Sequence, residues 1–184
     1  MNRRKIFSSE LLDITIQRMT QQLIENHGDF EDTVILALQP RGVFLAERLK
    51  TCLEDNIGKS VKLGYLDITF HRDDFRRREK PLQANTTHVP FLIEGKKVIL
   101  VDDVLYTGRS VRAALDAMTT FGRPEAVELA VLVNRKYNRD LPIEPNVVGR
   151  HVNTVASQRV EVELKGENFS EDSIWLTEKE KNQD

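Results

Sequence analysis

The chain has 184 residues, of which 40% are hydrophobic and 30% are charged, a composition typical of one globular domain with a substantial core. The net charge of −2 gives no field that would draw the whole molecule to nucleic acid or to an anionic membrane, and the single cysteine, Cys52, excludes an internal disulfide and a cysteine-rich metal site. The sequence shows no signal peptide and no apolar run long enough to span a bilayer, so we expect a cytoplasmic protein without membrane contact.

The first part of the chain alternates predicted helices and strands. A helix is expected over about 9–26, because apolar residues recur there at spacings of four, three and four: Leu12, Ile16, Met19 and Leu23. The almost entirely apolar stretch 33–38 predicts a strand that is covered on both faces. A second helix is predicted over 42–54, and a second strand over 61–70.

The chain then changes character, because residues 71–87 are mostly polar and follow no clear period. Such a stretch is typical of a functional or an unordered loop. Six further elements are predicted after it: a strand over 98–101, a helix over 109–121, a strand over 126–133, and short strand-like pieces at 147–152, 159–164 and 173–177. We interpret the whole of 1–184 as a single α/β domain with an open, mainly parallel sheet flanked by helices, and residues 177–184 as a frayed tail.

Two aspartates, Asp102 and Asp103, directly follow one apolar strand, at the edge where ligands bind to such sheets. Adjacent strand residues point to opposite faces, so we do not expect the two carboxylates to share a proton. Residues 107–110 (TGRS) then open a helix, whose free N–H groups favour an anion. Carboxylates that accept from sugar hydroxyls, followed by this N–H cradle, predict a ribose 5-phosphate site. Taken alone, the segment also suits a turn acid followed by a helix cap.

The stretch 98–110, VILVDDVLYTGRS, resembles the phosphoribosyl diphosphate (PRPP) motif of type I phosphoribosyltransferases. With LDITFHRDD upstream and GRPEAVELAVLVNR and LPI…VG downstream, the similarity covers about 5–165 and resembles the pyrimidine operon attenuation protein (PyrR) family. The resemblance implies a type I phosphoribosyltransferase fold, in which a small hood of short strands covers the main sheet.

The resemblance also implies two activities. One is a uracil phosphoribosyltransferase, which forms UMP and diphosphate from uracil and PRPP. The other is regulation, through binding of pyrimidine-operon leader mRNA in response to uridine nucleotides such as UMP or UTP. The alternative is a uracil phosphoribosyltransferase of pyrimidine salvage without RNA-binding activity. A purine or orotate enzyme of the same fold is less well supported, because Tyr106 stands where purine-using relatives often carry aspartate.

Carried over by residue, the resemblance assigns PRPP binding to Arg41, Gly42, Arg72, Asp102, Asp103, Tyr106, Thr107, Gly108, Arg109 and Ser110. The catalytic roles fall to Asp102 and Asp103, on the ribose hydroxyls, and to Arg41, on the leaving diphosphate. Mg²⁺ would be bound through PRPP near the two aspartates, with no protein ligand assigned directly. Segment 71–87 would form a flexible lid over the site.

The resemblance implies that uracil is recognised by backbone groups near Val133, Asn134 and Arg135, and by the short strands after residue 145. It also implies a homodimer or homotetramer, with the first helix near the interface. RNA binding would use a set of basic residues: Arg135, Lys136, Arg139, Arg150 and Arg159. Residues 134–140 (NRKYNRD) and 153–158 depart from the family's usual pattern, so both the regulator and the alternative stay open.

Overall fold

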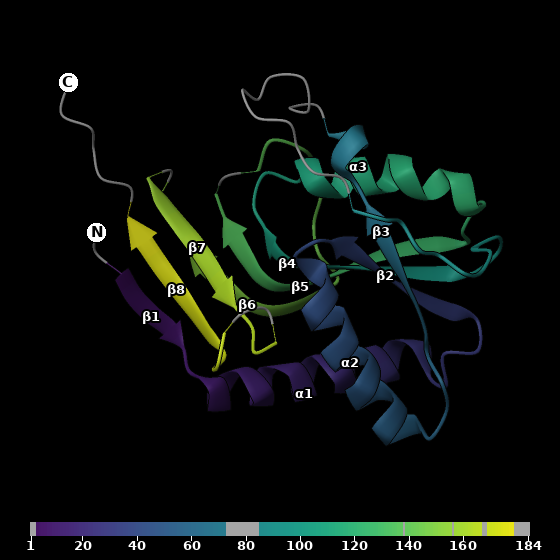
Figure 1. Cartoon of the computed structure of the whole chain (residues 1–184), viewed down its shortest axis with the longest axis horizontal. Helices are drawn as coiled ribbons and strands as arrows, with labels where there is room; N and C mark the ends of the chain where they lie inside the picture. Colours follow the sequence, from purple (N-terminus) through teal and green to yellow (C-terminus); the bar gives the residue numbers. More distant parts are fainter. Residues whose placement is uncertain (1–2, 73–84, 138, 156, 167–168, 179–184) are drawn as a thin grey trace.

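The structure is a computed structural model that describes residues 3–72, 85–137, 139–155, 157–166 and 169–178. It contains a five-stranded sheet in the order β3-β2-β4-β5-β6 and a three-stranded sheet in the order β1-β8-β7 (Figure 1). Every pairing in the larger sheet is parallel, whereas the smaller sheet is antiparallel. The predicted α/β fold with a hood of short strands is therefore confirmed.

The main sheet consists of β2 (Thr33–Gln39), β3 (Lys62–Asp67), β4 (Lys97–Leu105), β5 (Ala126–Lys136) and β6 (Val147–Asn153). The hood consists of β1 (Arg3–Phe7), β7 (Gln158–Glu163) and β8 (Ser173–Glu178). The helices are α1 (Ser9–His27), α2 (Gly42–Ile57) and α3 (Arg109–Met118), with 3₁₀ turns at Thr69–His71 and Thr119–Phe121. No helix within the described ranges is long and apolar enough to cross a membrane.

The central strands β2 and β4 separate two hydrophobic cores, because their successive side chains point to opposite faces. Ile35 and Ile99 pack with α1 and α2 in one core, whereas Leu36 and Leu100 pack with α3 in the other. Figure 1 shows the same layering, with α1 and α2 on one side of the sheet and α3 on the other. The all-apolar reading of residues 33–38 as a strand covered on both faces is therefore confirmed.

Several predicted boundaries were wrong. The strand expected over 61–70 ends at Asp67 and gives way to a 3₁₀ turn. The strand expected over 98–101 continues to Leu105, so the paired aspartates lie inside a strand rather than beyond its end.

The hood differs from prediction in three respects. Its strand β1 was not predicted, because five residues, RRKIF, give too short a pattern. The piece at 147–152 is β6, which pairs with β5 as an edge strand of the main sheet. The frayed tail was expected from residue 177, but Thr177 and Glu178 belong to β8, and Thr177 is buried. Residues 179–184 lie outside the described residues.

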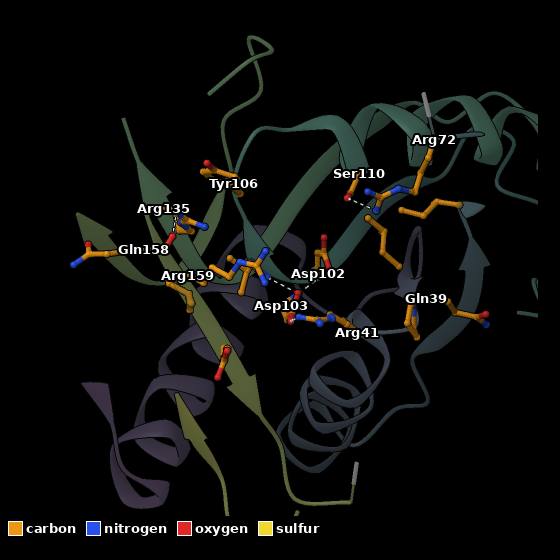
Figure 2. Close-up of a pocket in the computed structure, with 16 residues that line it drawn as sticks. Gln39, Arg41, Arg72, Asp102, Asp103, Tyr106, Ser110, Arg135, Gln158 and Arg159 are labelled. Atoms are coloured by element: carbon orange, nitrogen blue, oxygen red, sulfur yellow. Dashed lines mark hydrogen bonds and ion pairs between the residues drawn. The ribbon is translucent and has the colours of Figure 1, made fainter. Parts of the chain in front are cut away.

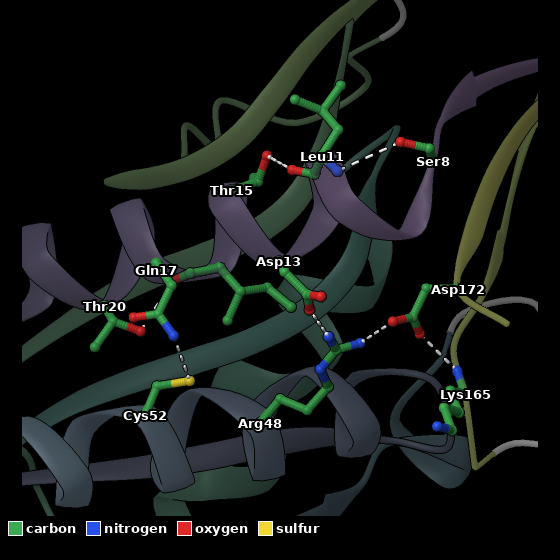
Figure 3. A network of polar contacts seen from close by, with 11 residues as sticks. Ser8, Leu11, Asp13, Thr15, Gln17, Thr20, Arg48, Cys52, Lys165 and Asp172 are labelled. Atoms are coloured by element: carbon green, nitrogen blue, oxygen red, sulfur yellow. Dashed lines mark hydrogen bonds and ion pairs between the residues drawn. The ribbon is translucent and has the colours of Figure 1, made fainter.

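One arginine joins the hood to α1 and α2, the two helices that lie on the same side of the main sheet (Figure 3). Arg48 of α2 donates to Asp13 of α1 at 2.5 Å and to Asp172, just before β8, at 2.7 Å. The other oxygen of Asp172 accepts from the backbone N–H of Lys165 at 2.7 Å. Because Asp172 is buried, this network fixes the hood against α2. The loop that leads into α2 contributes to the candidate site described below.

Candidate functional site

A pocket of about 490 Å³ opens where the main sheet meets the hood (Figure 2). Because the strands of the main sheet are parallel, their carboxyl ends lie at one edge, and β7 faces this edge from the hood. The polar lining comes from five segments of the chain: Gln39, Arg41, Arg72, Asp102, Asp103, Tyr106, Ser110, Arg135, Gln158, Arg159 and Glu161. A second cavity of about 160 Å³ adjoins it along Tyr106–Val111.

Asp102 and Asp103 both line the pocket and are 9% and 5% exposed. The expectation that they face opposite ways was wrong. An oxygen of Asp102 accepts from the backbone N–H of Asp103 at 2.9 Å, and an oxygen of Asp103 accepts from that of Val104 at 2.7 Å. Each side chain thus folds back along the strand, so both carboxylates reach the same pocket.

Burial shifts the titration of this pair. Burial, together with the neighbouring charge of Asp103, raises the pKa of Asp102 well above its ordinary value. Burial also raises the pKa of Asp103, although the Arg41 guanidinium at 3.9 Å acts in the opposite direction. The protonation of one carboxyl group therefore affects that of the other. Ligand groups that donate hydrogen bonds or carry positive charge would stabilise both carboxylates.

The loop between β2 and α2 supplies a cation next to the aspartates. Arg41 stands immediately before α2, and its side chain is 65% exposed on the pocket wall. Gly42 does not line the pocket: a Cβ there would lie 2.3 Å from the carbonyl oxygen of Val101, so only glycine allows α2 to pack this closely on β4. Of the two residues predicted from this loop, Arg41 faces the pocket, and Gly42 allows the close packing of α2 that positions Arg41.

The segment after β4 has the geometry of an anion cradle. Gly108 has a φ of +91° and immediately precedes α3, so the backbone turns sharply into the helix. Thr107, Gly108, Arg109 and Ser110 all line the smaller cavity, and Arg72 reaches Ser110 with an Nη1–Oγ distance of 3.5 Å. The predicted helix N-terminus is confirmed, and it shares its cavity with Asp102.

Of the three residues expected to hold uracil, only Arg135 lines the pocket. Its guanidinium lies 3.8 Å from the centroid of the Tyr106 ring and donates to the carbonyl of Gln158 at 2.8 Å. Val133 is buried in the core, and Asn134 is buried as the acceptor of a hydrogen bond from Arg139. The expected contacts are with backbone groups rather than with these two buried side chains, so they stay a prediction.

The short strands after residue 145 were expected to contribute to uracil recognition, but the individual residues of β7 that line the pocket were not predicted. Gln158, Val160 and Glu161 line the pocket beside Arg159, which had been assigned to RNA. The strand pattern of this segment was visible, but no signal showed that its edge faces the main sheet.

The five basic residues expected to bind RNA do not form one patch. Arg135 and Arg159 line the pocket, and Arg139 donates to the carbonyl of Tyr106. Arg150 lies over the Phe7 ring at 4.9 Å and borders a separate outer hollow near Arg18 and His151, whereas Lys136 is exposed at the end of β5. The set is therefore dispersed over the pocket, the core and an outer face.

Most of the expected lid, 73–84, lies outside the described residues. Its described flanks meet at one side chain. Asp67 accepts from the backbone N–H of Thr69 at 3.1 Å and from that of Asn85 at 3.2 Å. Asp67 thus binds the backbone on both sides of the expected lid.

Comparison with known proteins agrees with this geometry. The phosphoribosyl transferase domain family matches residues 4–165. A hypoxanthine phosphoribosyltransferase from Staphylococcus aureus matches with a TM-score of 0.62 at 16% identity, covering 85% of this chain and 80% of that one. A purine phosphoribosyltransferase from Pyrococcus horikoshii matches with a TM-score of 0.59 at 22% identity, covering 79% and 86%. The fold and the site together define a phosphoribosyltransferase of type I.

Two curated relatives identify one family within the phosphoribosyltransferases. The bifunctional protein PyrR of Listeria welshimeri is 41% identical over 168 residues, covering 90% of this chain and 91% of the relative. That of Chloroflexus aurantiacus is 42% identical over 164 residues, covering 89% and 90%. The chain belongs to the PyrR family.

Proposed function

We propose that the chain is a bifunctional pyrimidine-operon regulator and uracil phosphoribosyltransferase. The observation that carries the enzymatic half is the juxtaposition of Asp102 and Asp103 with the N-terminus of α3 in one continuous pocket. Membership of a family whose relatives are named bifunctional supports the regulatory half.

PRPP fits this site in one orientation. The 5′-phosphate lies in the Thr107–Ser110 cradle, the ribose hydroxyls donate to Asp102 and Asp103, and the diphosphate extends toward Arg41. N1 of uracil then attacks C1 of the ribose, the bond from C1 to the diphosphate oxygen breaks, and the N1 proton is released. Little nucleophilic help is required, so positioning and charge stabilisation account for the rate.

The carboxylates fit a Mg²⁺ ion that arrives with PRPP. Burial raises the pKa of both Asp102 and Asp103, so a nearby cation would stabilise their charged forms. Within the described residues, no three His, Cys, Asp or Glu side chains are grouped to hold a metal on their own. We therefore propose that the ion is held chiefly by PRPP, with these two residues beside it, and that it neutralises charge on the departing diphosphate.

The base would lie between the Tyr106–Arg135 stack and the edge of β7. A phenol, unlike a carboxylate, is poorly suited to exchange protons with a purine ring. Tyr106 therefore favours a pyrimidine over the purines used by the structural neighbours, whose similarity concerns the fold alone.

The enzymatic proposal is tested by turnover of uracil, orotate, guanine and hypoxanthine with PRPP and Mg²⁺. We expect uracil to be converted fastest, and conversion of a purine at a higher rate would overturn the assignment. The Arg41→Gln variant is expected to raise KM for PRPP by about tenfold through loss of a charge-assisted contact. Arg123→Gln, an exposed residue near the opposite edge of the sheet, is the matched control.

The regulatory proposal is tested by RNA affinity, with and without UMP, on the leader transcript of the host's pyrimidine genes at stated salt. Tight binding that UMP strengthens is the expected result. An active enzyme with only weak, salt-sensitive RNA binding would favour the alternative, a salvage enzyme. The dispersion of Arg135, Arg139 and Arg159 over internal contacts is the observation that keeps this alternative in view.

We also propose a cytoplasmic homo-oligomer. Helix α1 exposes Leu11 and Ile14, at 39% and 66%, and such apolar side chains gain from a protein partner. A cytoplasmic location accords with the single cysteine and with the phosphorylated substrate PRPP.

A further inference from the structure

The segment 139–143 lies against the outer side of the loop that joins β4 to α3. The carbonyl oxygen of Thr107 accepts two hydrogen bonds, from the backbone N–H of Asp140 at 3.0 Å and from that of Leu141 at 3.2 Å. The carbonyl oxygen of Tyr106 accepts a hydrogen bond from the Arg139 guanidinium. Two successive carbonyls of the phosphate cradle are thus held by one neighbouring segment.

These contacts orient the N–H groups of the cradle. In a planar trans peptide, the C=O and the following N–H point in opposite directions. Holding the Tyr106 carbonyl therefore fixes the direction of the Thr107 N–H, and holding the Thr107 carbonyl fixes that of Gly108. A cradle whose N–H groups are oriented before the ligand arrives binds phosphate without a reorganisation cost.

The same segment restrains the cradle from two other directions. The carboxylate of Asp140 accepts from Nε of Arg109 at 3.0 Å. A Cβ on Gly108 would lie 3.3 Å from the Ile143 side chain and 3.5 Å from Cβ of Leu141, so the chain at the left-handed glycine has close packing behind it. A polar contact thus restrains Arg109, and close apolar packing restrains Gly108, within the same turn.

Arg139 is itself anchored to the main sheet. Its Nη2 donates at 2.7 Å to the side-chain oxygen of Asn134, which is only 3% exposed near the end of β5. The guanidinium therefore links a rigid strand to the Tyr106 carbonyl with its two terminal nitrogens. A lysine has one nitrogen and no planar fork, so it cannot reproduce this link.

We propose that Arg139 and Asp140 are positioning residues for the 5′-phosphate of PRPP, acting through the Tyr106–Arg109 backbone rather than on the ligand. The proposal rests on the proposed phosphoribosyltransferase function. It assigns Arg139 to the enzyme, whereas the sequence had placed it in an RNA-binding set.

The test compares Arg139→Ala, Arg139→Lys and Asp140→Asn with the charge-matched control Arg123→Ala. We expect Arg139→Ala to raise KM for PRPP by about tenfold, while KM for uracil changes by less than about twofold. Arg139→Lys should recover only part of the loss, and Asp140→Asn should give a smaller increase. In the ligand-free protein, hydrogen exchange of the Asp140 and Leu141 amides, which donate to the Thr107 carbonyl, should accelerate, with β4 and β5 unchanged.

Equal losses for both substrates, or faster exchange throughout the main sheet, would mean a general structural role and would overturn the proposal. Unchanged PRPP affinity and unchanged loop exchange in all three variants would overturn it as well. Asp140→Asn preserves side-chain shape at an exposed position, so it decides the question even if Arg139→Ala fails to fold. If the wild type neither binds PRPP nor converts uracil, the proposed function fails, but the exchange measurement still decides whether the segment orders the loop.

Discussion

At the scale of single residues, Asp102 combines its proposed role in PRPP binding with a cost in stability. It is buried beside a second carboxylate, and both effects raise its pKa, so its charged form opposes folding. A folded-state pKa above the unfolded value means that the stabilising contribution is present at acidic pH and is lost as the pH rises through the folded-state pKa. The charged form of Asp102 therefore lowers the stability of the ligand-free protein near neutral pH, where PRPP would be bound.

The Asp102→Asn variant tests this conflict. We expect it to lose activity yet to have a higher Tm than the wild type at about pH 8, and the gain should shrink as the pH is lowered to about 5. Each kcal/mol of stabilisation corresponds to about 2–4 °C in a domain of this size. Calorimetry across the pH series makes the measurement, with the exposed Asp116→Asn as control. A difference in Tm that is constant with pH would contradict the electrostatic explanation.

At the scale of elements, the position of α2 depends on Gly42. A Cβ there would meet the backbone carbonyl of Val101 at 2.3 Å, and backbone cannot move aside as a side chain can. We expect Gly42→Ala to cost about 3 kcal/mol and to weaken PRPP binding, because α2 begins directly after Arg41. Urea unfolding and KM for PRPP measure the two effects.

Gly64→Ala is the matched comparison, because its nearest contacts, at 3.0–3.3 Å, are side-chain atoms of Leu36, Phe91 and Val89. These can shift, so the expected cost is about 1 kcal/mol. Similar losses for the two variants would mean that the approach of α2 to β4 is not the critical constraint.

The attachment of the hood depends on Arg48. Its loss would leave Asp172, which is 4% exposed, without the cation that pairs with its charge, although the Lys165 N–H would still donate to it. We expect Arg48→Met to cost about 2–4 kcal/mol in urea unfolding, below the cost for a completely buried pair because Arg48 is partly exposed. Asp13→Asn removes the exposed partner of the same arginine and should cost under about 1 kcal/mol. The reverse order would contradict the assignment of the Asp172 contact as the one that holds the hood.

The elements that follow a strong local pattern could be predicted, whereas those set by distant partners could not. The all-apolar β2 and the amphipathic α1 follow directly from their residues, and the motif at 98–110 located the start of α3, although β4 continues to Leu105. Strand β1 exists because β8 pairs with it, and no local signal in RRKIF shows this. The common orientation of Asp102 and Asp103 arises from hydrogen bonds to the next backbone N–H, which override the ordinary alternation of a strand. The position of β7 beside the pocket depends on how the hood packs against the main sheet, which no local pattern indicates.

At the scale of the whole molecule, the exposed face of α1 predicts how copies associate. We expect Ile14→Asp to shift the protein to a smaller species in light scattering, since Ile14 is 66% exposed in a single copy. Leu92→Asp makes the same chemical change at another exposed site, 75% exposed in the loop before β4, and should leave the mass unchanged. Equal effects of the two changes, or none from Ile14→Asp, would locate the interface elsewhere.

The strand order of the hood has a consequence for the protein while it is being made on the ribosome. Strand β8, at Ser173–Glu178, lies between β1 and β7, so the first strand and the strand that walls the pocket are joined only by the last one. A nascent chain can pair β2, β4 and β5 as they emerge, but it cannot complete the hood until β8 has left the exit tunnel. The main sheet thus becomes available during translation, whereas the candidate pocket is finished only after synthesis has passed Glu178.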